Sequence, residues 1–79
     1  MLPKEKVDSY LENNGWTKFV DDDDVDFFQS RDGQVNIVYP EDSLLENNAS
    51  EYERLKNEAL ADIAKYEGMT VAELVKAIQ

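Results

Sequence analysis

The fold that we predict is decided by residues 25–40, which read VDFFQSRDGQVNIVYP. β-Branched and aromatic side chains favour strands at Val25–Arg31 and Val35–Tyr39. The dipeptide Asp32-Gly33 between them is typical of a two-residue type I′ turn, which needs a positive φ at both central positions. Pro40 ends the second strand because proline has no backbone N–H for the ladder. The segment therefore predicts an antiparallel hairpin.

A two-residue loop also fixes which side chains share a face of this hairpin. It places Phe28 opposite Ile37 and Phe27 opposite Val38. One face then carries Phe28, Val35, Ile37 and Tyr39. The other face carries Val25, Phe27 and Val38. Because both faces are partly apolar, the second is either covered by an N-terminal helix or left open as a protein-binding surface.

The segment before the hairpin supplies a helix and a further strand. Pro3–Asn14 has apolar residues at helical spacing, and Gly15 provides a left-handed stop. Trp16–Val20 is aromatic and β-branched, which predicts the first strand of the sheet.

The segment after the hairpin predicts a connection and two helices. Residues 40–49 are polar, with Leu44 and Leu45 as apolar anchors. Ser50–Glu53 has the sequence of a capping box and predicts a long helix that ends at Gly68. Thr70–Glu73 is a second capping box and predicts a short final helix.

Residues 1–79 are therefore predicted to form a single small acidic α+β domain with the order α-β-β-β-α-α. We expect a three-stranded antiparallel meander with the helices packed on one face.

The composition argues against several kinds of site. The 79 residues include no cysteine and no histidine, which removes the commonest zinc ligands and the commonest general base. A chain this short also has little room for a substrate pocket. We therefore predict no enzymatic activity, no catalytic residue, no cofactor and no metal centre. Without an apolar segment typical of a signal peptide or a membrane span, we expect a cytoplasmic protein.

The charge is distributed unevenly along the chain. Eighteen acids and eight bases give a net charge of −10, and residues 21–53 hold eleven of the acids but one base, Arg31. Such a surface repels nucleic-acid phosphates and anionic lipids, so we expect no direct contact with nucleic acid or membrane. It attracts a basic protein surface. The alternative is that the acids only keep a small protein in solution.

Four consecutive aspartates stand in the stretch FVDDDDVDFF. As an EF-hand loop starting at Asp22 the acids are correctly spaced, but Phe27 and Gly33 occupy the positions that need glycine and glutamate. A looser contact of Asp22 and Asp24 with a divalent cation is one alternative. A solvated turn between two strands is another.

A pattern in the first half of the chain consists of Gly15-Trp16, Phe28, Gly33 and Val35-x-Ile37-Val38-Tyr39-Pro40. It resembles the small HicA toxin domain, a relative of the double-stranded-RNA-binding fold. The resemblance implies an mRNA-cleaving toxin whose catalytic histidine follows the first strand. Asp21–Asp24 stands there instead, so the ribonuclease activity and the basic RNA-binding face are not carried over. The two C-terminal helices also depart from the family.

We expect the acid-rich hairpin to bind a basic protein partner, with acids giving steering and apolar residues giving affinity. The predicted partner-binding residues are Asp21, Asp22, Asp23, Asp24, Asp26, Phe27, Asp32, Val38, Glu41 and Asp42. The expected function is that of a bacterial or phage antitoxin, immunity protein or inhibitor that masks a basic surface. One alternative is an accessory or structural domain that forms a homodimer through an open sheet face. A divergent HicA-like RNA binder is the third.

Overall fold

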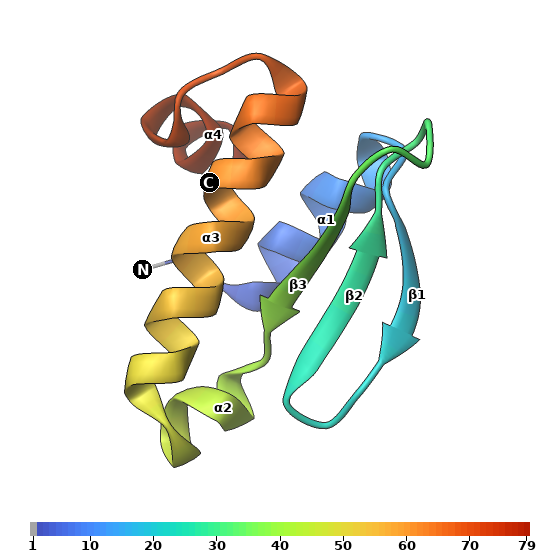
Figure 1. Cartoon of the computed structure of the whole chain (residues 1–79). Helices are drawn as coiled ribbons and strands as arrows, with labels where there is room; N and C mark the ends of the chain where they lie inside the picture. The colour runs from blue at the N-terminus through green and yellow to red at the C-terminus, as the bar shows by residue number, and fades with distance from the viewer. Residues whose placement is uncertain (1) are drawn as a thin grey trace.

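The computed structural model describes residues 2–79 and confirms the α+β class and the predicted order of one helix, three antiparallel strands and further helices (Figure 1). In chain order the elements are α1 (Lys4–Asn13), β1 (Thr17–Asp21), β2 (Val25–Gln29), β3 (Asn36–Pro40), α2 (Asp42–Asn47), α3 (Ala49–Glu67) and α4 (Val71–Ile78).

The sheet is a meander with the strand order β1-β2-β3, and β2 pairs with β3 in the predicted register. Phe28 lies opposite Ile37 and Phe27 lies opposite Val38. The alternation along these two strands therefore sorts their side chains between two faces as the sequence predicts.

The turn between β2 and β3 differs from the prediction. Gly33 has a φ of 76°, but Asp32 does not have a positive φ, so the predicted type I′ turn is wrong. The Gly33 amide donates to the Ser30 carbonyl over 2.9 Å, and the Ser30 amide donates to the Val35 carbonyl over 2.8 Å. The Asp32 carboxylate holds this longer turn because it accepts hydrogen bonds from the Ser30 hydroxyl and the Gln34 amide.

The helix ends are mostly as predicted. Gly68 ends α3 with a φ of 74°, and Thr70 forms the predicted capping box at the start of α4. The predicted cap at Ser50 is wrong, because Asn48 caps α3 instead and its side chain accepts a hydrogen bond from the Glu51 amide. Asparagine is as good a cap as serine, so Asn48 and Ser50, two positions apart, were both candidates at this end.

The residues 40–49 that we predicted as a connection contain α2, which buries Leu44 as expected but leaves Leu45 half-buried. The short helix turns the chain from the end of β3 toward α3 (Figure 1).

The helices lie on one face of the sheet, as predicted. In Figure 1, α1 passes behind the sheet, and α3 lies beside β3. Their apolar stripes meet the inner face of the hairpin in a core whose buried members include Val7, Leu11, Trp16, Phe28, Ile37, Tyr39, Ile63 and Leu74. Because α1 packs on the face that carries Phe28, the face that carries Phe27 has no helix over it in the described part of the chain.

Candidate functional site

The uncovered face of the sheet carries an apolar strip. We call it the open-face strip and define it as Phe19, Val20, Val25, Phe27 and Val38. Phe19 keeps 52% of its surface exposed and Val20 keeps 41%, which are high fractions for large apolar side chains. The rings of Phe19 and Phe27 lie against each other with centroids 6.0 Å apart. Exposed apolar side chains gathered on one face are typical of protein-binding surfaces.

An irregularity in β1 builds the outer part of this strip. Lys18 pairs with Phe28 and Val20 pairs with Phe27, so Phe19 is an extra residue in the ladder between them. Such a bulge lets two successive residues lean toward the same face. Lys18 therefore points toward the core side while Phe19 and Val20 both join the open-face strip.

The run of aspartates forms a tight turn at one end of the open-face strip. The Asp22 amide donates to the Val25 carbonyl over 3.0 Å, and the Asp22 carboxylate accepts from the Asp23 amide over 2.7 Å. The side chains of Asp22, Asp23 and Asp24 are exposed, as is that of the neighbouring Asp21. This local geometry agrees with the predicted turn between strands.

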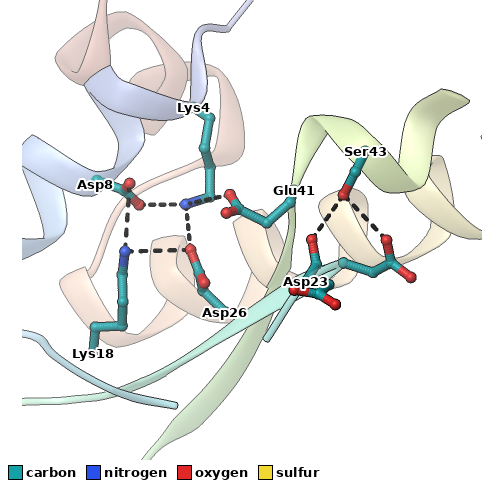
Figure 2. Close-up of polar contacts among 8 residues, drawn as sticks. Lys4, Asp8, Lys18, Asp23, Asp26, Glu41 and Ser43 are labelled. Carbon is teal, nitrogen blue, oxygen red and sulfur yellow. Dashed lines mark hydrogen bonds and ion pairs between the residues drawn. The ribbon is translucent and has the colours of Figure 1, made fainter. Parts of the chain in front are cut away.

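The start of α2 braces this turn from the other side, as Figure 2 shows. The Ser43 hydroxyl donates to the Asp23 carbonyl over 2.8 Å and to the Asp24 carboxylate over 3.1 Å. The Glu41 amide donates to the Asp24 carbonyl over 2.8 Å. Asp42 is exposed in the first turn of α2. We call Asp21–Asp24 and Asp42 together the acidic end.

Three of the predicted partner-binding residues do not belong to this surface. Asp32 lies in the β2–β3 turn, at the opposite end of the sheet from the acidic end (Figure 1). Its hydrogen bonds from the Gln34 amide and the Ser30 hydroxyl lower the pKa of Asp32 and occupy its carboxylate within the turn.

Asp26 is the second exception, and its inclusion in an exposed surface was wrong. Its side chain is fully buried, because it alternates onto the same face as Phe28. Lys4 Nζ lies 2.6 Å from Asp26 Oδ2, and Lys18 Nζ lies 3.4 Å from the same atom. The alternation along β2 already carried the signal that Asp26 points inward, but we grouped it with the neighbouring acids instead.

Figure 2 shows that Asp26 belongs to an ion network beneath the acidic end. Besides Asp26, Lys4 Nζ contacts Asp8 Oδ1 at 2.6 Å and Glu41 Oε1 at 3.1 Å. Lys18 Nζ also lies 3.7 Å from Asp8 Oδ2. The predicted partner-binding residue Glu41 is therefore half-buried and engaged inside the molecule rather than free at its surface.

The network shifts the pKa values of its central groups. Burial alone would lower the pKa of Lys4, but hydrogen bonds to Asp26, Asp8 and Glu41 outweigh it and raise that pKa above its usual range. Burial would likewise raise the pKa of Asp26, but its hydrogen bond to Lys4 and the charges of Lys4 and Lys18 act together against it, so the pKa of Asp26 is lowered. Both groups therefore stay charged at neutral pH.

The bases nearest to the aspartate run are thus already engaged within the molecule. Lys4 and Lys18 serve the ion network, and Arg31 is held at the opposite end by two hydrogen bonds to Glu67, of 2.8 and 3.1 Å. The exposed acids of Asp21–Asp24 consequently keep a concentrated negative charge beside the open-face strip.

No family model, curated protein or solved structure matches this chain. Within residues 2–79, no helix combines the length and apolar character needed to cross a bilayer.

Proposed function

We propose that this protein is a small acidic protein-binding module that covers a basic surface of a partner protein. The observation that carries the proposal is the direct junction of the open-face strip with the acidic end. Val20 is followed by Asp21, and Asp24 is followed by Val25, so apolar and acidic side chains share one continuous edge.

The two parts have different roles in the proposed complex. Burial of apolar side chains such as Phe19 and Phe27 supplies affinity, at roughly 25 cal/mol for each Å² removed from water. The acids at Asp21–Asp24 accelerate encounter with a basic surface and disfavour acidic partners. An interface of ordinary size takes about 800 Å² from each partner, which is about one sixth of the 4789 Å² surface of this chain. Five partly exposed side chains supply less than this, so the contact extends over the acidic end.

The charge favours a basic partner over a second copy of the chain. Each copy carries a net charge of −10, and pairing two open faces would add the repulsion of two such molecules. Antitoxins, immunity proteins and phage inhibitors that mask the basic working surface of a nucleic-acid enzyme have the required combination of small size and acidity. We propose this class of role for the chain.

Affinity capture with matched variants tests the proposal. The wild-type chain is immobilised and the dominant protein that it captures from the host is identified and purified. The affinity of this protein for the wild-type chain is then measured by calorimetry at about 50 and 300 mM salt. We expect a basic protein whose affinity falls at least about tenfold in Phe19→Ser/Phe27→Ser, and several-fold in Asp22→Asn/Asp23→Asn/Asp24→Asn. High salt should weaken the wild-type complex nearly as much as the three aspartate substitutions do, because it screens exposed charges.

The control removes the same amount of charge from another surface. Glu53→Gln/Glu58→Gln/Asp62→Asn neutralises three exposed acids of α3 and should leave the affinity nearly unchanged. If all three variants bind alike, the proposed surface is wrong. If light scattering instead reveals a dimer that Phe27→Ser dissociates, the open face serves self-association. A gel shift with RNA would favour the HicA-like alternative.

A further inference from the structure

Three acids from separate segments converge at the edge of the ion network. Asp21 in β1 lies directly opposite Asp26 in β2, and Glu41 follows the end of β3. One carboxylate oxygen from each residue lies within 4.8 Å of the others. Like charges directly opposite each other destabilise a sheet. The pairing of Asp21 with the buried Asp26 therefore needs a compensating positive charge.

The two known cations of the network compensate one end of the Asp26 carboxylate. Lys4 and Lys18 both approach Oδ2. Oδ1, at the other end, is buried and accepts no hydrogen bond from any residue between 2 and 79. A buried carboxylate oxygen without a partner is rare and costly in a folded protein. This unpartnered atom is an observation separate from the clustering of the acids.

The formal charges of the site also show that positive charge is missing. The carboxylates of Asp8, Asp21, Asp26 and Glu41 contribute −4, and the ammonium groups of Lys4 and Lys18 contribute +2, which leaves −2. One divalent cation would balance this sum.

We propose that Asp21, Asp26 and Glu41 bind a hard divalent cation of the Ca²⁺ or Mg²⁺ class, with Asp26 Oδ1 as the buried ligand and water completing the coordination. The donor set consists of oxygen atoms, which Ca²⁺ and Mg²⁺ prefer, whereas zinc and copper favour histidine and cysteine, and this chain has neither. This site differs from the contact through Asp22 and Asp24 that the sequence suggested, because those two exposed residues lie outside the three-acid cluster.

The nearby ammonium groups limit the expected affinity of the site for the cation. Glu41 is shared between the ion and Lys4, so the affinity is expected to be modest, with a Kd on the order of 10⁻⁴ M. An ion that binds the folded state alone then raises the melting temperature by at least about 5 °C at 10 mM. The ion would join β1, β2 and the start of α2, so it would stiffen the acidic end.

The test uses the full chain freed of metal with a chelator at pH 7. Thermal unfolding is followed with 10 mM CaCl₂, with 10 mM MgCl₂ and with NaCl at equal ionic strength, and calorimetry gives the stoichiometry. We expect one ion per chain and a rise in melting temperature beyond that in NaCl. Asp21→Asn should abolish this rise, because it removes one of the three charged ligands. Asp21 is exposed, so the substitution should not prevent folding.

The melting temperatures of Asp21→Asn without divalent ions and of Asp23→Asn with them provide two further tests. Without divalent ions, Asp21→Asn should melt at a higher temperature than the wild type, because it removes the charge opposite Asp26. Asp23→Asn removes an equal charge from the same turn, outside the three-acid cluster, and should keep the ion-dependent rise. Equal losses in Asp21→Asn and Asp23→Asn would mean a diffuse ion atmosphere and would overturn the site. So would a wild type that responds to CaCl₂ and MgCl₂ no more than to NaCl.

Discussion

The two faces of the sheet carry similar apolar side chains but have opposite environments. Phe28 and Phe27 are adjacent in β2, and each lies opposite an aliphatic residue of β3. Phe28 is fully buried under α1 and α3, whereas Phe27 lies on the uncovered face against Phe19. Burial in this protein therefore depends on which face the helices cover rather than on the hydrophobicity of the residue. The second face keeps apolar residues that no helix covers, and we propose that a partner protein covers them.

The acids show the same contrast. Asp26 faces inward and is surrounded by two lysines, whereas Asp22 and Asp23, a few residues earlier, face water. The inward acid is tolerated because Lys4 and Lys18 compensate its charge, since an unpaired buried carboxylate would be strongly destabilising. The exposed acids need no such compensation, and their charge remains available to a second molecule.

The largest difference between the two faces is expected for the adjacent phenylalanines. Phe28→Ala should lower the free energy of unfolding by about 3–5 kcal/mol, because it removes a fully buried ring and leaves a cavity. Phe27→Ala should cost less, about 1–2 kcal/mol, because its ring is only partly buried in the folded state. Urea unfolding of both variants measures the two values. Similar costs would show that the second face is packed in the free protein, which would contradict the contrast.

An intermediate effect is expected for the buried acid. Asp26→Asn should lower the free energy of unfolding by about 2 kcal/mol at pH 7 in the absence of divalent ions, because Lys4 and Lys18 lose a charged hydrogen-bond partner. The pKa of Asp26 is lowered in the folded state from its ordinary value of 3.8. The stabilisation from this carboxylate is therefore fully present above about pH 4 and is lost as the pH falls through the lower folded-state pKa.

The pH dependence separates this effect from general repulsion. Urea unfolding of wild type and Asp26→Asn should differ at pH 7 and converge toward pH 2. Asp23→Asn, on the exposed turn, should differ little from the wild type at either pH. A difference between wild type and Asp26→Asn that stays constant from pH 7 to pH 2 would show that its cause is packing rather than charge.

Much of the fold was predictable from local patterns. The register of β2 with β3 followed from two short apolar runs around one turn, and the ends at Gly68 and Thr70 followed from backbone chemistry that neighbouring residues determine. The turn type was not predictable in the same way. Asp32 is compatible with both signs of φ, and its bonds to Ser30 and Gln34 decided the outcome.

The candidate site was predictable in part. The acid run and the apolar character of Phe27 and Val38 are visible in the sequence. The bulge that brings Phe19 and Val20 to the open face depends on the pairing of β1 with β2, for which no single residue is diagnostic. Two partners of Lys4 lie 22 and 37 positions away, and such long-range pairs arise only when the chain is folded.

A small effect on stability is expected at the bulge in β1, where Lys18 faces the core side and Phe19 faces the open side. Phe19→Thr keeps a β-compatible residue, loses the ring contact with Phe27, and exposes no buried group. It should change the free energy of unfolding by about 0.5 kcal/mol, because the Phe19 ring is already half-exposed in the folded state. Urea unfolding at two protein concentrations measures this value. A loss above about 2 kcal/mol that grows with concentration would mean that a second copy of the chain covers the open-face strip, and the basic partner would then lose its binding surface.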